Sequence, residues 1–318
     1  MGRSVGLYVG EALGSYGFPD GHPFGPDRLA AFKRELERRG LHAHESARLL
    51  EPVVASREQL ERFHQPGYID RVRQLSEAGS GLLDMGDTPA FPGCYEAAAA
   101  VVGTVLDGVE RIMAGDLDAA FVPIAGLHHA RREMAGGFCI FNDCCVAIET
   151  LKSQHGLERV GYVDIDAHHG DGVYYGFVDD PAVIIVDIHQ DGRFIYPGTG
   201  SAEETGAGPA AGTKLNLPLL PGADDAAFRD AWGRARPFLD ERRPRFFLMQ
   251  CGADSVQGDP ITHMAFSPEA HRQATRDVRR LAGAHAEGRL LCTGGGGYDR
   301  ENLAAAWCAV VEELLAGQ

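Results

Sequence analysis

The stretch RVGYVDIDAHHGDG, residues 159–172, joins an apolar run to a dense group of titratable side chains. The run at 159–165 has the β-branched and aromatic composition of a buried strand. The side chains that end it fall within positions 164–171 and are Asp164, Asp166, His168, His169 and Asp171. They are metal ligands, catalytic bases or a polar turn, and the rest of the chain must decide among these.

Similar apolar runs recur along the whole chain, at 5–10, 119–124, 182–188, 213–219, 245–251 and 289–295, and an additional short strand is expected near 41–46. Helical patterns lie between them at 93–114, 141–155, 224–239, 267–286 and 299–315, with long loops at 11–28, 79–93 and 189–212. Apolar strands that alternate with helices are typical of a parallel sheet covered on both faces. We predict a single-domain α/β fold over residues 1–318, with one open parallel sheet of about eight strands.

Polar clusters follow five of these strands directly: GLHHA (126–130), DAHHGDG (166–172), HQDGRFIYPGTG (189–200), GADS (252–255) and GGGGYD (294–299). The carboxyl ends of parallel strands share one edge of the sheet, and ligands bind in the crevice there. Solvated turns would show no such bias. The clusters therefore predict an active site at this edge.

Composition narrows the class of protein. The 318 residues are 44% hydrophobic and 24% charged, a balance typical of soluble globular proteins. The net charge of −15 argues against a nucleic-acid partner and suits a cationic substrate, although it also serves solubility. No signal peptide or membrane span is recognisable, and the seven cysteines show no C-x-x-C spacing, so we expect a cytoplasmic protein without a membrane partner. Scattered apolar residues predict no oligomeric state.

Asp166 and His168 are candidate metal ligands because residues two apart on an extended chain point the same way. Asp254 can reach the same edge from another strand. Three ligands leave room for water or substrate, which is typical of catalytic metal sites, and a set without thiolate suits Zn²⁺, Fe²⁺ or Co²⁺. In the alternative interpretation, Asp166 caps a turn and His168 packs in a polar core.

His128 and His129 are candidate bases. Asp164 and Asp171 could each orient one imidazole, which would supply a general base and a general acid beside the metal. Tyr298 follows a run of four glycines, where its phenol could donate a hydrogen bond to a developing oxyanion. A phosphate-binding loop is disfavoured, because the glycine spacing matches neither common phosphate motif.

Together these motifs resemble the histone deacetylase superfamily, within the arginase–deacetylase fold. The resemblance covers nearly the whole chain and rests on GHPFGPDR (21–28), GDTPAFPGCYEAA (86–98), GLHHARREMAGGFCIFND (126–143), DIDAHHGDGV (164–173), YPGTG (196–200), GADSVQGDP (252–260) and GGGGY (294–298). The form GLHHA is similar to the bacterial acetoin-utilisation branch and to histone-deacetylase-like amidohydrolases.

The resemblance implies a role for each motif residue in a zinc deacylase. Zinc is held by Asp166, His168 and Asp254. His128 pairs with Asp164 and His129 with Asp171, and Tyr298 polarises the scissile carbonyl. His129 takes a proton from the attacking water and a histidine then protonates the leaving amine, although the division of these duties between His128 and His129 stays open. His169 receives no catalytic role, and a structural hydrogen bond is expected for it.

The resemblance also implies a substrate channel, with Phe138 on one wall and Tyr196 on the other, where a phenylalanine is often found. The further channel positions are Asp87 at the rim, Gly137, Ile261 and Gly296. Arg28 matches an arginine of an internal cavity behind the metal. A structural K⁺ ion would involve Asp164 and Asp187.

The implied reaction is hydrolysis of an acyl-lysine amide in a protein or peptide. Acetylated polyamines or small acetylated metabolites are the alternative substrates; Ile261, where a gating glutamate could stand, favours peptides. A non-catalytic acyl-lysine reader is a more remote alternative. A two-manganese ureohydrolase is disfavoured, because the positions for its extra aspartates are Gly170 and Val256.

Overall fold

The computed structural model describes residues 4–19 and 21–316, which form one open sheet with the strand order β2-β1-β3-β8-β7-β4-β5-β6. Every pairing in it is parallel. The strands are β1 (Val5–Tyr8), β2 (Ala47–Leu50), β3 (Ala119–Val122), β4 (Val160–Asp164), β5 (Val183–Gln190), β6 (Lys214–Leu219), β7 (Phe247–Gln250) and β8 (Leu290–Thr293). The predicted parallel sheet of eight strands is confirmed.

The strand expected at 41–46 is wrong. Leu41–Ala43 form a short 3-10 helix, and the strand β2 begins only at Ala47. β2 pairs with β1 alone and forms the edge of the sheet, and its side chains are only partly buried or exposed. An edge strand needs no continuous apolar run, so its sequence signal is weak.

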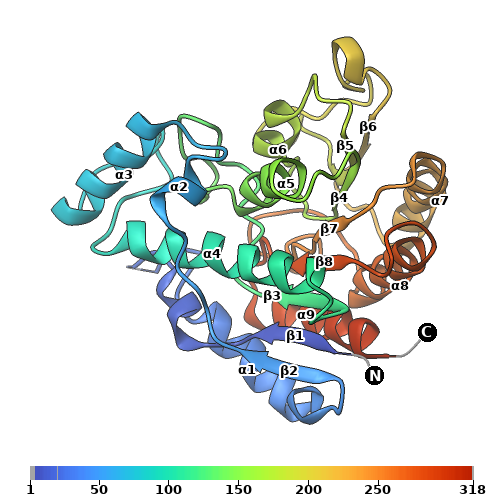
Figure 1. Cartoon of the computed structure of the whole chain (residues 1–318), viewed down its shortest axis with the longest axis horizontal. Helices are drawn as coiled ribbons and strands as arrows, with labels where there is room; N and C mark the ends of the chain where they lie inside the picture. The colour runs from blue at the N-terminus through green and yellow to red at the C-terminus, as the bar shows by residue number, and fades with distance from the viewer. Residues whose placement is uncertain (1–3, 20, 317–318) are drawn as a thin grey trace.

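Helices cover both faces of the sheet (Figure 1). α4 (Cys94–Met113) packs against α3 (Pro66–Ala78) and α5 (Asp143–Ser153), and α6 (Asp171–Gly176) packs against α5. On the other face, α9 (Arg300–Leu315) packs between α1 (Arg28–Arg38) and α8 (Pro268–His285), and α7 (Asp225–Arg242) packs beside α8. The short α2 (Arg57–Leu60) and the 3-10 helices Glu11–Ser15 and Gly208–Ala210 lie in the connections. The sequence reading missed α1 and α3.

The core consists of the apolar strands and the helix faces against them. All four residues of β7 and of β8 are fully buried, and Trp307 of α9 packs against Phe121 of β3. None of the helices in the described ranges is long and apolar enough to cross a membrane.

The start of α5 fixes the loop after β3. Asn142 caps the helix by accepting the N–H of Cys145, a contact worth about 1 kcal/mol. Its side-chain amide also donates to the carbonyls of His128 and Ala130, at 3.1 and 2.9 Å. The same residue therefore begins α5 and holds the loop that carries the two histidines of the site.

Candidate active site

Three buried side chains converge beyond the carboxyl ends of β4 and β7. Nδ1 of His168 lies 3.1 Å from Oδ1 of Asp166 and 3.0 Å from Oδ2 of Asp254. The donor atoms of the three residues all lie within 4.8 Å of one another. Within the described ranges, this is the one group of three or more such side chains that could hold a metal ion.

The donor set fits a divalent metal. Two buried carboxylates beside one imidazole carry more negative charge than the site itself offsets, and a bound cation would supply the difference. Carboxylate oxygens and an imidazole nitrogen, without thiolate, suit Zn²⁺, Fe²⁺ or Co²⁺. The arrangement supports the metal-ligand interpretation over a polar turn.

The protein also orients the other oxygens of these carboxylates. Oδ2 of Asp166 accepts hydrogen bonds from the Gln250 side chain and from the Gly296 N–H, both at 2.9 Å. Oδ1 of Asp254 accepts the N–H of Ala167 at 2.9 Å. Such partners fix the direction of a metal ligand and tune its affinity.

The charges of the three residues are strongly coupled. Burial raises the pKa of Asp254, and the Asp166 carboxylate raises it further, to about 7, against the opposing effect of His168. Burial lowers the pKa of His168, but its contacts with the two carboxylates outweigh burial and raise that pKa to about 10. Without a metal, the proton on His168 balances part of the negative charge.

Glycines let two loops approach these carboxylates. A Cβ atom at Gly296 would lie 2.2 Å from Oδ2 of Asp254 and 2.8 Å from Oδ2 of Asp166. A Cβ at Gly252 would lie 2.0 Å from the same Asp166 oxygen. Any larger residue would displace the proposed ligands, so the glycines are part of the site.

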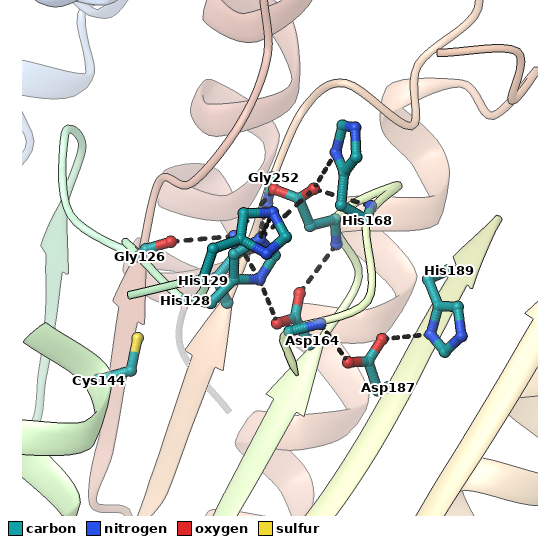
Figure 2. A network of polar contacts seen from close by, with 12 residues as sticks. Gly126, His128, His129, Cys144, Asp164, His168, Asp187, His189 and Gly252 are labelled. Atoms are coloured by element: carbon teal, nitrogen blue, oxygen red, sulfur yellow. Dashed lines mark hydrogen bonds and ion pairs between the residues drawn. The ribbon is translucent and has the colours of Figure 1, made fainter. Parts of the chain in front are cut away.

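Two histidine–aspartate pairs lie beside the three residues, and Figure 2 shows the pair formed by His128 and Asp164. Nδ1 of His128 lies 2.8 Å from Asp164, and Nδ1 of His129 lies 2.7 Å from Asp171. The two Nε2 atoms are 3.0 Å apart. A hydrogen bond between them requires one donor and one acceptor, so at most one of the rings is doubly protonated.

The surroundings shift the pKa values of the two imidazoles in opposite directions. Burial lowers the pKa of His128, but the charges of Asp164 and Asp166 outweigh this and raise it to about 10. Burial lowers the pKa of His129 to about 4, and the charge on His128 acts in the same direction against Asp171. In the metal-free site these opposite pKa shifts favour a proton on His128 over one on His129.

Tyr298 lines the same small cavity as His128, His129 and His168. Its backbone N–H donates to Asp259 at 2.8 Å, which fixes the end of the glycine run. Burial raises the pKa of the phenol well above its usual range, and the nearby charges of Asp254 and Asp166 add to this. The phenol therefore keeps its proton and can act as a hydrogen-bond donor.

Arg28 lies fully buried behind the glycine run. Its Nε donates to the Gly297 carbonyl at 2.9 Å and its Nη2 to the Gly295 carbonyl at 2.6 Å, while the guanidinium carbon lies 3.9 Å from the centre of the Phe24 ring. Burial lowers its pKa to about 10. The structure thus buries Arg28, and its place in an internal cavity behind the metal stays a prediction.

Two cavities meet at His129. An inner one of about 10 Å³ is lined by proposed catalytic groups and by Gly137 and Gly296. An outer one of about 450 Å³ opens to the surface and includes Asp87 and Tyr196. The Tyr196 ring lies 5.0 Å from the His129 ring, and the Phe138 ring lies 5.9 Å from the Tyr298 ring. Ile261 lines neither of these cavities.

Asp187 on β5 lies beside Asp164 on β4, because the two residues are paired in the parallel register of these strands. Its oxygens already have protein partners, His189 Nδ1 at 2.6 Å and the Gly170 N–H at 2.9 Å (Figure 2). K⁺ binding by Asp164 and Asp187 stays a prediction. His169 Nδ1 lies 2.8 Å from the Thr199 hydroxyl, in agreement with the structural hydrogen bond expected for it.

Sequence reasoning missed several residues that hold this site. Gln250 reaches Asp166, and Asp143 accepts the N–H groups of Gly126 and Leu127 at 2.9 and 2.8 Å. Arg131 donates to Asp171 at 2.8 Å. Gln250 lies one residue before the end of a predicted strand and Arg131 lies two residues after His129, so both stand near the sheet edge, but no sequence pattern identifies their partners.

Comparison with known proteins agrees with this geometry. Residues 22–314 match the histone deacetylase domain. The chain is 35% identical over 308 residues to the acetoin utilization protein AcuC of Bacillus subtilis, covering 94% of this chain and 78% of that protein. It is 36% identical over 296 residues to a histone deacetylase-like amidohydrolase of Pseudomonas aeruginosa, covering 92% and 77%.

A solved structure gives the same result for the fold. The crystal structure of the HDA15 HD domain superposes with a TM-score of 0.91 at 27% identity, covering 98% of this chain and 88% of that one. The match extends over the sheet, the covering helices and the loops that carry the site. The chain therefore belongs to the histone deacetylase family.

Proposed function

We propose that this protein is a zinc-dependent amidohydrolase that removes acetyl or other acyl groups from lysine side chains of proteins or peptides. The observation that carries the proposal is the convergence of Asp166, His168 and Asp254 within 4.8 Å, beside two buried histidine–aspartate pairs. Similarity to a protein named histone deacetylase-like amidohydrolase supports the reaction class. We take the whole chain as a single catalytic domain.

Zinc would be held by Asp166, His168 and Asp254, with Fe²⁺ or Co²⁺ as other ions that suit these ligands. When bound, the metal supplies a Lewis acid that polarises the amide carbonyl and lowers the pKa of water. The ligand carboxylates are already oriented by Gln250 and by the N–H groups of Gly296 and Ala167. This preorganisation supports a resident metal.

His129 is the general base in this proposal. It lines both cavities and is held by Asp171 through Nδ1. Its Nε2 faces Nε2 of His128 at 3.0 Å and would exchange that partner for the attacking water. His128 is the charged ring and can return a proton to the leaving lysine amine. The Tyr298 phenol, which keeps its proton, donates a hydrogen bond to the oxyanion that forms on the carbonyl.

The substrate enters through the outer cavity. Tyr196 lines this cavity, and Phe138, which lies outside both cavities but packs against Tyr298, would flank the lysine methylenes from the other side. Asp87 at the rim accepts an N–H group of the substrate backbone. The seven unpaired cysteines suit a reducing cytoplasm as the place of action. The net charge of −15 also favours a second candidate substrate, a cationic acetylpolyamine.

A substrate panel tests the proposal. Purified zinc-loaded protein is assayed with acetyl- and longer acyl-lysine peptides and with acetylated polyamines, and the released acid is quantified. We expect hydrolysis of acyl-lysine peptides with a higher kcat/KM than that of acetylpolyamines. A clear preference for acetylpolyamine would reverse this order. Peptide binding without any hydrolysis would instead identify a non-catalytic reader.

A further inference from the structure

The outer cavity carries charges of both signs. Of its lining residues, Asp84, Asp87 and Asp171 are acidic and Arg131 is basic, and His129 connects the cavity to the inner site. A pocket built for a purely cationic substrate would need no guanidinium at its wall. The partners of each charge show which of them is available to a substrate.

Asp84 is committed to its own loop. Its Oδ1 accepts the N–H groups of Gly86, Asp87 and Thr88 at 2.9, 3.1 and 3.0 Å, and its Oδ2 accepts the Thr88 hydroxyl at 2.6 Å. Oδ1 of Asp87 also accepts the Thr88 hydroxyl, at 3.2 Å. The Asp87 carboxyl also shares a hydrogen bond with Asp84, and because its side chain is exposed it is the acceptor that the rim offers to a substrate.

Only one nitrogen of the Arg131 guanidinium makes a hydrogen bond within the described part of the chain. Its Nη2 donates to Asp171 at 2.8 Å, and the guanidinium carbon lies 5.6 Å from the centre of the Tyr175 ring. Its Nε and Nη1 have no side-chain or carbonyl partner in the described part of the chain, and the side chain is 44% exposed. A guanidinium has five N–H donors in a fixed fork that matches a carboxylate. One edge of that fork is therefore free in the cavity.

The charges of Asp87 and Arg131 both shift the pKa of the Tyr196 phenol. Burial raises the pKa of the Tyr196 phenol, the carboxylates of Asp171 and Asp87 raise it further, and Arg131 lowers it. The ring that would line the lysine path thus lies within electrostatic reach of an acceptor from the rim and a donor from the wall. A substrate seated over Tyr196 would meet both charges.

We propose that Arg131 and Asp87 together recognise the backbone end of an acyl-lysine that carries a free α-carboxylate. Arg131 binds the carboxylate and Asp87 accepts an N–H of the α-nitrogen. The preferred substrates are then free Nε-acyl-lysine and acyl-lysine at the C-terminus of a peptide. This assignment rests on the proposed deacylase function and names a substrate class for it.

The test compares substrates that differ only in charge. The kcat/KM for Nε-acetyl-lysine is divided by that for its α-carboxamide, in wild-type protein and in Arg131→Ala. A hydrogen bond between a guanidinium and a carboxylate corresponds to about tenfold or more, so we expect a ratio of about ten that falls to about one in the variant. Any effect of Arg131 on Asp171 cancels in the ratio, because both substrates use the same catalytic groups.

Two variants serve as controls. Arg131→Lys keeps the charge but not the fork, and should retain part of the ratio. Arg38→Ala removes another carboxylate-paired arginine, on α1 and far in sequence from the cavity, and should leave the ratio unchanged. A wild-type ratio of about one, or a ratio that Arg131→Ala does not change, would overturn the assignment.

A second substrate pair identifies the source of the carboxylate. Peptides in which an internal acetyl-lysine is followed by Asp or by Asn should be hydrolysed with the same kcat/KM. If the enzyme distinguished these two peptides but not acetyl-lysine from its α-carboxamide, Arg131 would bind an acidic side chain, and the proposal would be contradicted. Binding of the first pair to zinc-loaded Tyr298→Phe protein, measured by calorimetry, should give the same ratio without turnover. If the binding ratio is observed but no substrate is hydrolysed, the proposed deacylase function would be wrong and the assignment of Arg131 would still hold.

Discussion

The inner site around Asp166, His168 and Asp254 and the outer cavity with Asp87 and Arg131 meet at His129, but they are built in opposite ways. In the inner site every charged side chain is buried and has several protein partners. In the outer cavity Arg131 and Asp87 are exposed and keep hydrogen-bonding groups that a substrate can use, whereas Asp171 is buried and Asp84 bonds to its own loop. The difference indicates that the chemistry is preorganised by the sheet edge, whereas substrate choice is left to side chains that meet solvent.

Loss of a proposed ligand should have the largest effect. Asp254→Asn should abolish zinc binding and lower kcat by on the order of 10³ or more, because Lewis-acid catalysis is worth several kcal/mol. Metal analysis and acetate release measure both. Asp70→Asn, which removes a surface carboxylate paired with Arg57, is the matched control and should change neither.

The Asp254→Asn variant should be more stable than wild type when no metal is present. Burial and the Asp166 charge raise the pKa of Asp254 to about 7, so its ionised form costs free energy in the metal-free fold. Thermal unfolding in chelator at pH 8 should show a higher Tm for Asp254→Asn, and in zinc a higher Tm for wild type. A lower Tm in both conditions would mean that Asp254 is merely structural.

Tyr298→Phe should separate chemistry from metal binding. Removal of one oxyanion donor in other enzymes lowers kcat by about 10²–10³. We expect this loss with unchanged zinc content and nearly unchanged KM. Turnover at the wild-type rate would show that the phenol has no role in the reaction.

Replacement of Gln250 should have a smaller effect. Gln250→Ala removes the donor to Asp166 Oδ2, and loss of such a partner typically costs 10–100-fold in metal affinity or activity. Gln190→Ala is the matched control, because Gln190 also ends a buried strand but bonds to the His263 N–H. If both variants lost zinc affinity equally, the effect would be one of folding.

The rim should show the smallest effect, and it should depend on pH. Burial raises the pKa of Asp87 to about 6, and Asp84 raises it through a hydrogen bond and its charge. Asp87 is ionised above that pH and loses its charge below it, so KM for a peptide should increase as the pH falls through about 6. Asp87→Asn should remove this dependence of KM. An unchanged KM profile would exclude Asp87 from substrate binding.

The sequence predicted the sheet and the inner site better than the outer cavity. Buried strands such as β4 carry continuous apolar runs, and the side chains just beyond their ends share one edge by topology alone. The edge strand β2 lacks such a run, so its predicted position was wrong. The role of Gln250 follows from its β7–β4 register, and that of Arg131 from a contact with Asp171, and neither leaves a pattern in the sequence.

Zinc titration of the metal-free protein tests the central claim most directly. Protein stripped with a chelator is titrated with Zn²⁺ while acetate release from an acetyl-lysine peptide is followed. The account predicts that activity returns and reaches its plateau at one zinc ion per chain. Urea release from arginine or agmatine with two manganese ions per chain, or tight peptide binding with no acetate at any zinc level, would contradict it.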